Sequence, residues 1–362
     1  MDQRGTFVAN WIAQVKKAVA AGSAARLEER HPDLVSAVDA KAIADRGFPG
    51  LAIDAGIRLD FLCQALAAGR PMLLADHLCW LKVALGTRGF GPEHIRAPME
   101  CLRAELLESL PPDHGELASH AIDDALRVFD AAPTDSESLL SDGQPHVDLA
   151  RRYLLAVLEG RRNDAERLVL DALEAGASPD DLELHVLMRT QHEIGRMWQV
   201  GELHAAEEHF ASRVAERLTT LLRSKLDRRE QRGLRLVIAS VGGNDHDLAA
   251  RMLADRFEIA GWDPILLGAN TPAIDLARAV LDFEADLVAL STALSLHVRA
   301  TAEVCAAIRA LPARANSPIL VGGHPFQVVP DLHEVVGADA TAATIGEALQ
   351  VAEKLAATRQ AS

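Results

Sequence analysis

The sequence is short of the features that mark secreted, zinc-binding and membrane-spanning proteins. Its four cysteines, Cys63, Cys79, Cys101 and Cys305, lie far apart with no CxxC pair, so neither a disulfide framework nor a zinc site is predicted. No run of about eighteen apolar residues is present, and the N-terminal residues MDQRGTFVANW lack the pattern of a signal peptide. We therefore expect a cytoplasmic protein with no membrane partner.

Positive charge is also scarce. The 362 residues include 37 Lys and Arg against 52 Asp and Glu, which gives a formal net charge of −15 at pH 7. An acidic surface of this kind repels phosphate backbones, so we expect no nucleic-acid partner. Hydrophobic residues at 49% and charged residues at 25% are typical of an ordinary globular protein.

The first two thirds of the chain have a helical pattern. Apolar residues recur at three- and four-residue spacing from about residue 6 to residue 132, and four more such segments lie between residues 146 and 224. The segment AAPTDSESLLSDGQP between them is rich in Ser, Asp and Pro, which is typical of a linker or exposed loop. We predict an N-terminal all-helical, globin-like domain over residues 1–140 and a four-helix bundle over residues 146–224.

The pattern changes after Gly233. Five short apolar runs alternate with amphipathic helical stretches, which predicts a parallel sheet with helices on both faces over residues 233–362. The flavodoxin-like strand order, within the Rossmann-like class, fits best. The expected fold class is therefore multidomain, α followed by α/β.

Three polar or glycine-rich clusters follow predicted strands. They are GGNDHD (242–247), STALS (291–295) and GGHPF (322–326), and neighbouring strands would bring them to one rim of the sheet. Glycines there let a bulky ligand approach the backbone. His246, with Asn244 two residues before it, suits a metal ligand whose second ring nitrogen is held by a partner. Taken alone, His246 would be an ordinary loop histidine.

The order of these clusters, with LGANTP (267–272) after the second strand, resembles the cobalamin-binding domain of B12-dependent methyltransferases, mutases and photoreceptors. The resemblance implies that His246 is the lower axial ligand of cobalt, that Ser291 and Ser295 bond the nucleotide tail, and that glycines line its channel. The cofactor-binding residues it implies at the sheet are Asn244, Asp245, His246, Asp247, Leu248, Ser291, Ala293, Leu294, Ser295, Gly322 and Gly323. Three departures stand out: Asn244 replaces the usual Asp, Ala249 replaces the usual Gly, and the usual tyrosine of the last loop is missing, since Tyr153 is the only tyrosine.

The bundle contains MWQVGELHAAEEHF, in which Trp198 is followed by nine residues and then by Glu208 and His209. This spacing resembles light-sensing B12 proteins, and the resemblance implies that the three side chains cap the adenosyl group on the upper face of cobalt. The alternative is a core tryptophan beside a solvated helix face. Gln199 stands where the light-sensing regulators have a cobalt-binding histidine, which leaves His192, His204, His209 or water for that position.

The N-terminal region shows no winged-helix DNA-binding module. Instead, the segment ADHLCWLKVALGTRGFGPEHIRAPMECL (75–102) resembles photocobilins, which hold biliverdin beside adenosylcobalamin. By that resemblance His77 and Trp80 contact the bilin, and Arg70, Arg88 and Arg96 are candidate partners of its propionates. The alternative is a boundary histidine and a core indole on one helix.

These patterns together predict a photoreceptor rather than an enzyme. It would bind adenosylcobalamin and biliverdin, and breakage of the cobalt–carbon bond by light would change its conformation and its assembly as a homo-oligomer, dimer or tetramer, with an unknown downstream protein partner. Two alternatives are a corrinoid carrier protein of a methyltransferase system and a bilin-free B12 sensor whose N-terminal domain docks a protein.

Overall fold

The computed structural model describes residues 1–36, 50–226, 229–313 and 316–360. Residues 37–49 of the predicted N-terminal domain lie outside this description. Helices make up the described part of that region, namely α1 (Gln3–Arg30), α3 (Leu51–Ala68), α4 (Met72–Gly86), α5 (Glu93–Ser109) and α6 (Pro112–Ala131). Helix α1 packs against α3 and α5, and α4 packs against α6.

The predicted four-helix bundle is confirmed. Its helices are α7 (Val147–Leu158), α8 (Arg162–Glu174), α10 (Arg189–Gln199) and α11 (Ala205–Arg223), and α10 is preceded by a short helix α9 (Pro179–Asp181) and a π-helical stretch η1 (Leu182–Met188). The bundle has an apolar core of its own, which includes Tyr153, Leu187 and Leu218.

The C-terminal region contains the predicted parallel sheet in the expected flavodoxin-like order, β2-β1-β3-β4-β5. Its strands are β1 (Arg235–Val241), β2 (Asp263–Thr271), β3 (Leu287–Ser291), β4 (Ile319–Gly322) and β5 (Ala340–Ala342). Alternate residues of β1 point to opposite faces: Leu236 and Ile238 pack with α12 (Leu248–Ile259) and α17 (Ile345–Gln360). Val237 and Ala239 face the other layer of helices, which is formed by α13 (Ala273–Asp282), α14 (Val298–Arg309) and α16 (Leu332–Val336).

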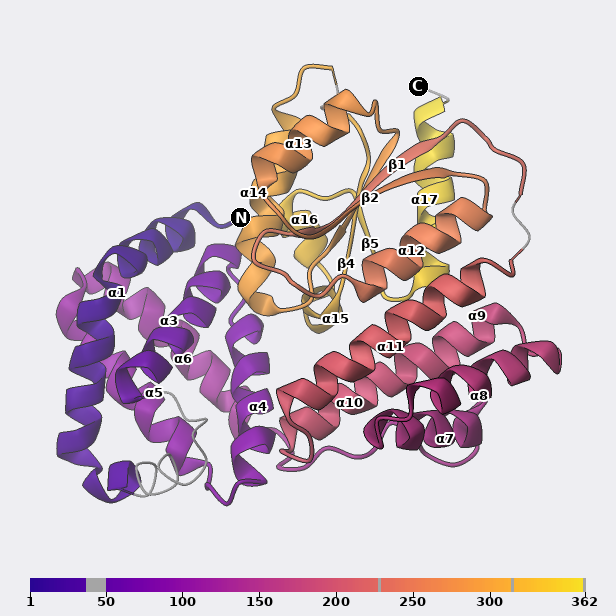
Figure 1. Ribbon diagram of the computed structural model, residues 1–362. Coiled ribbons are helices and arrows are strands. Elements are labelled where there is room, and N and C mark those ends of the chain that lie inside the picture. Colours follow the sequence, from indigo (N-terminus) through magenta and orange to yellow (C-terminus); the bar gives the residue numbers. More distant parts are fainter. Residues whose placement is uncertain (37–49, 227–228, 314–315, 361–362) are drawn as a thin grey trace.

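The three parts of the chain pack against one another (Figure 1). The apolar core of the N-terminal helices runs without a break into the α13 and α14 face of the sheet. At one end of the bundle, α11 contacts α12, and at the other end α10 contacts α4. Among the described residues, no helix combines the length and the apolarity needed to cross a membrane.

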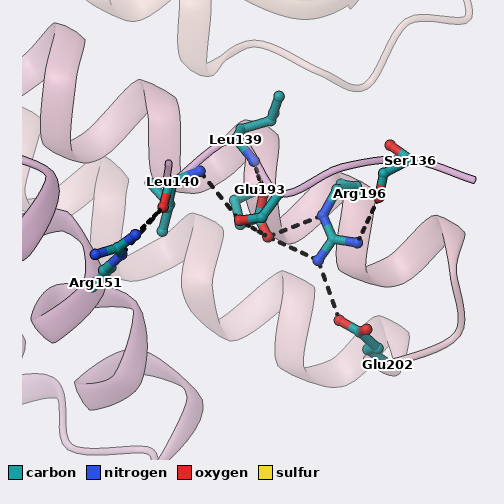
Figure 2. A network of polar contacts seen from close by, with 8 residues as sticks. Ser136, Leu139, Leu140, Arg151, Glu193, Arg196 and Glu202 are labelled. Atoms are coloured by element: carbon teal, nitrogen blue, oxygen red, sulfur yellow. Dashed lines mark hydrogen bonds and ion pairs between the residues drawn. The ribbon is translucent and has the colours of Figure 1, made fainter. Parts of the chain in front are cut away.

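The segment between α6 and α7, predicted to be a linker or exposed loop, is fastened to the bundle (Figure 2). The buried carboxylate of Glu193 accepts hydrogen bonds from Leu139 N at 2.7 Å and from Ser138 Oγ at 3.0 Å. Burial by itself raises the pKa of Glu193, but these bonds and the Arg196 guanidinium hold it below its usual value. Leu140 is buried in the bundle core. The segment is irregular and mostly exposed, as predicted, but it does not hang free of the bundle, because Ser138 and Leu139 bind Glu193 and Leu140 is buried.

Candidate cobalamin site

The loops after β1, β3 and β4 meet at the carboxyl edge of the sheet, as predicted. Ser240 of β1 is paired with Ser291 of β3, and Ser291 is paired with Gly322 of β4. Beyond the strands, Asn244 Nδ2 donates a hydrogen bond to Ser291 O at 3.1 Å, and Thr292 N donates to Gly322 O at 2.9 Å. The three polar clusters therefore form one continuous rim.

His246 lies exposed on the first of these loops with a defined ring orientation. Its Nδ1 is 3.2 Å from Asn244 Oδ1, and its backbone N donates to the same oxygen at 3.2 Å. Because Asn244 Nδ2 is committed to the Ser291 carbonyl, the amide must present its oxygen to the imidazole, which places the Nδ1 proton. The lone pair of Nε2 is thereby left for a ligand, and no described residue bonds that atom. A histidine that binds a metal needs such a nitrogen, with its other ring nitrogen held by a partner.

The loop is held by a residue that the sequence analysis did not single out. Asn270, at the end of β2, accepts a hydrogen bond from Gly243 N at 2.7 Å, and its own N–H donates to Asn244 O at 2.9 Å. Asn270 has a positive φ of 51°, a conformation that Asn tolerates better than most residues. In the sequence, the only sign of this role was that Asn270 lies within LGANTP (267–272), after the second predicted strand.

The loop after β3, STALS (291–295), has a buried polar group that a polar part of a ligand could bind beside the sheet. Ser295 is only 2% exposed, and its Oγ is buried without a hydrogen-bond partner among the described residues. Buried hydroxyls usually have a partner, because an unsatisfied one costs about 1–3 kcal/mol. A nucleotide tail would supply that partner, so the residues present fit the group that the sequence implied. Ser291 is half-buried and the Leu294 side chain is 41% exposed.

Gly323 is required by the backbone of the third loop. Its φ is +119°, and a Cβ atom built there would lie 2.0 Å from Thr292 O. A Cβ on Gly322 would lie 3.3 Å from Ala342 O, which is close but less prohibitive. The glycine pair therefore lets β4 and the Thr292 turn approach each other at the edge of the predicted tail channel.

The remaining predicted residues of this rim have varied positions. Asp245 is exposed, Asp247 forms an ion pair with Arg251 at 2.7 Å, and Leu248 begins α12, while Ala293 is half-buried. His297 was missed by the sequence analysis: it belongs to the 3-10 turn η2 (Ser295–His297), and a Cβ on Gly243 would lie 3.4 Å from its ring. Burial lowers the pKa of His297, and the nearby His246 lowers it further.

The bundle contributes the predicted cap residues at the joined ends of α10 and α11. Trp198 is 43% exposed, so the alternative of a core tryptophan is wrong. Glu208 lies in the first turn of α11, where the helix dipole favours a carboxylate. Ser212 Oγ donates to Glu208 Oε1 at 2.7 Å, and the exposed His209 has its Nε2 3.6 Å from Glu208 Oε2.

The predicted bilin residues lie on α4. The His77 ring stacks on Phe61 with centroids 3.6 Å apart, and burial together with the Arg58 charge lowers its pKa to about 3. Trp80 is 38% exposed, so it is no core indole, and its ring centroid lies 5.9 Å from that of Trp198.

The three arginines proposed for the propionates already have protein partners. Arg70 pairs with Asp331 and Arg96 pairs with Asp130. Arg88 donates to the backbone oxygen of Gln199 at 2.9 Å. A bilin propionate would have to compete with these contacts.

Comparison with known proteins adds independent findings. Residues 149–223 and residues 234–353 each match a model of a B12 binding domain. The HTH-type transcriptional repressor CarH of Myxococcus xanthus is 32% identical over 184 residues, which cover 50% of this chain and 60% of the repressor. A corrinoid protein of Desulfitobacterium hafniense is 22% identical over 205 residues, which cover 55% of this chain and 94% of that protein.

A solved structure shares the fold of the second half of the chain. The monomethylamine corrinoid protein of Methanosarcina barkeri superposes with a TM-score of 0.52 at 18% identity, covering 58% of this chain and 99% of that one. The two matched segments coincide with the bundle and the sheet, which carry the cap residues and His246 respectively. Residues 149–223 and 234–353 are therefore B12-binding domains, and the chain is a cobalamin-binding protein.

Proposed function

We propose that this protein is a light sensor that holds adenosylcobalamin between the bundle and the sheet domain. The observation that carries the proposal is a pair of surfaces, one on the sheet domain and one on the bundle, each with groups that a ligand could contact. His246 has a fixed Nδ1 and a free Nε2 at the sheet edge, and the bundle presents a 43% exposed indole, Trp198, beside the carboxylate of Glu208. Covering a water-exposed indole with a flat organic group lowers the free energy, because apolar surface is removed from water.

The chain's own residues bind and orient the ligand in this proposal. His246 would bind the metal through its Nε2, while Asn244 would hold the ring and the Ser295 hydroxyl would bond the tail. Trp198 would pack on the adenosyl group, and Glu208, whose Oε1 accepts from Ser212 Oγ, would accept hydrogen bonds from the ribose hydroxyls. When bound, adenosylcobalamin supplies a cobalt–carbon bond that visible light breaks.

Without a ligand over them, Trp198 and Glu208 would be uncovered, and the contacts of the bundle would change. We propose that this change alters a homo-oligomer, a dimer or tetramer, and that a downstream protein reads the result. The protein acts as a sensor and not as an enzyme in this scheme. The similarity to a transcriptional repressor supports a regulatory role for the bundle and sheet.

Biliverdin is the second proposed chromophore, held by the N-terminal helices near the cap. Its support is the position of α4: Trp80 lies against Trp198, and His77 Nε2 is buried without a partner among the described residues. A pyrrole N–H or a lactam oxygen could satisfy that nitrogen. Biliverdin titrated into the protein should give a red absorption band that weakens in His77→Phe and persists in His120→Ala, an exposed histidine of α6. No band at all would favour a bilin-free sensor with a protein-docking N-terminal domain.

A corrinoid carrier is the second candidate function, because corrinoid proteins match the same half of the chain. A carrier must leave the upper cobalt face open to a partner enzyme, so it should bind methylcobalamin and adenosylcobalamin about equally. The sensor should prefer adenosylcobalamin and should change its elution volume in size-exclusion chromatography after illumination.

His246→Ala tests the site itself. The variant should give the spectrum of cobalamin without a histidine ligand and should lose cobalamin faster, whereas His120→Ala should behave as the unaltered chain. An unchanged spectrum in His246→Ala would remove His246 from its role. Equal binding of the two cobalamins, with no effect of light on assembly, would leave the carrier as the better description.

A further inference from the structure

Helix α4 of the N-terminal region lies where the two halves of the cobalamin site meet. It contacts α10, whose last turn carries Trp198, and it also contacts η2 and α15 (His324–Val328) of the sheet domain. The turn η2 begins with Ser295, and α15 follows Gly323 directly. One helix therefore contacts the cap helix, the turn that begins with the predicted tail serine, and the helix that follows the glycine pair.

The contacts with the sheet domain include an ion pair, beside the apolar core that the N-terminal helices share with the sheet. His324 Nε2 lies 2.9 Å and 3.0 Å from the two carboxylate oxygens of Asp76, which is in the first half of α4. The Asp76 carboxylate raises the pKa of His324 by accepting this bond. Because His324 is the residue after Gly323, the pair fixes the loop that closes the predicted tail channel.

The contact with the bundle lies one helical turn further along the same face of α4. The Trp80 ring packs on Trp198, and Gln199 Nε2 donates to Trp80 O at 3.1 Å. Arg88, just after α4, donates in turn to Gln199 O at 2.9 Å. At the position where similar light-sensing proteins have a histidine, this chain thus has an amide that binds another part of the protein.

The bundle is attached to the sheet domain directly at its far end. There α11 lies beside α12 (Figure 1). Arg223 of α11 pairs with Asp255 at 3.1 Å and also with Glu258, both on α12. The cap end of the bundle, at the carboxyl end of α10, meets α4 instead. In the proposed placement, rotation of the bundle about the α11–α12 contact would move the cap away from His246, and the α4 contacts oppose that movement.

We propose that α4 is a clasp across the cobalamin cleft, fastened to the sheet domain by Asp76 and His324 and to the bundle by Trp80 and Gln199. The clasp sets how long cobalamin stays bound, and it carries movement of the cap to the N-terminal helices. This inference rests on the proposed placement of cobalamin between bundle and sheet.

The test measures the rate at which the full chain releases hydroxocobalamin into an excess of competing apoprotein. Asp76→Asn weakens the polar contact of α4 with the sheet domain and Gln199→Ala removes the side-chain bond to the bundle, and each should speed release about tenfold, equivalent to about 1.4 kcal/mol. The double variant should release cobalamin about as fast as either single variant, because the two contacts act in series along α4. Asp123→Asn, which removes the Asp123–Arg103 pair within the N-terminal helices, is the matched control and should leave the rate unchanged.

The spectrum of the histidine-bound cobalt should be the same in all of these variants, which separates the clasp from damage at His246. Unaltered release rates with normal binding would overturn the clasp and leave the proposed function in place. Effects that multiply in the double variant would also overturn it, since they would describe two independent contacts. Failure of the unaltered chain to bind hydroxocobalamin would overturn the proposed placement of cobalamin and the clasp together.

Discussion

Replacing Asn244 by Asp would give the histidine loop the residue that is usual in similar cobalamin domains. In this structure the change conflicts with a second bond of the same side chain. Asn244 is fully buried, with Oδ1 facing His246 and Nδ2 donating to Ser291 O at 3.1 Å. A carboxylate keeps the acceptor toward His246 but turns a second oxygen toward the Ser291 carbonyl.

The expected changes in stability and affinity follow from the two bonds of Asn244, one to His246 and one to Ser291. Losing the donor in a buried site leaves two oxygens face to face, which should lower the free energy of unfolding of the cobalamin-free protein by about 1–3 kcal/mol. The bond to His246 changes from neutral to charged, which strengthens it by about 1 kcal/mol. That gain is largest when a metal on Nε2 makes the Nδ1 proton more acidic. Bound cobalamin should therefore stabilise Asn244→Asp more than it stabilises the unaltered chain.

Urea unfolding with and without hydroxocobalamin measures both effects, together with a titration of affinity by absorbance. We expect the cobalamin-free variant to be less stable and its affinity to rise by a few-fold, about 1 kcal/mol. Asn163→Asp, at an exposed position of α8, serves as the control. Equal stability of variant and parent, with equal affinity, would show that Asn244 does not position His246.

Three further predictions concern other parts of the structure. Gly323→Ala should cost more than about 3 kcal/mol of stability and abolish cobalamin binding, because the added Cβ would lie 2.0 Å from Thr292 O. Circular dichroism melting measures the loss, and Gly346→Ala, whose added Cβ meets nothing, should be unaffected. Trp198→Ala should weaken the preference for adenosylcobalamin over methylcobalamin about tenfold or more, since covering an indole is worth about 1.5–3 kcal/mol, and an unchanged ratio in competition titrations would count against the cap. Burial raises the pKa of Glu183 in η1 from 4.5 to about 8, so the folded chain retains a proton that the unfolded chain releases. Stability should therefore fall by about 5 kcal/mol as pH rises from below 4.5 to above 8. Glu183→Gln should remove that slope in urea titrations at about pH 5 and about pH 9, and a slope that persists would assign it to another group.

Much of the fold could be predicted from local pattern because its elements bury residues at regular spacing. In β1, Leu236 and Ile238 face one layer of helices while Val237 and Ala239 face the other, so the strand reads as a continuous apolar run. The positions of the three polar clusters after β1, β3 and β4 then followed from the strand order alone. The His246, Ser291 and Gly322 loops could be grouped in this way without any knowledge of side-chain contacts.

Long-range partners could not be predicted, because nothing local in the sequence specifies them. Leu139 and Ser138 looked like parts of a linker, yet the buried carboxylate of Glu193 binds both. Likewise, the sequence left a core position open as the alternative for Trp198, and only its 43% exposure in the folded chain excludes it.

The sequence by itself determined the classes of the three regions, the order of the strands and the histidine at the sheet edge, since each depends on periodicity or on residues close together in the chain. Only the tertiary structure decided that Asp76 binds His324, 248 residues away, and that Gln199 bonds the backbone of Trp80. Such pairs depend on how whole helices dock. Docking is set by the sum of many apolar contacts, among them the core that the N-terminal helices share with the sheet.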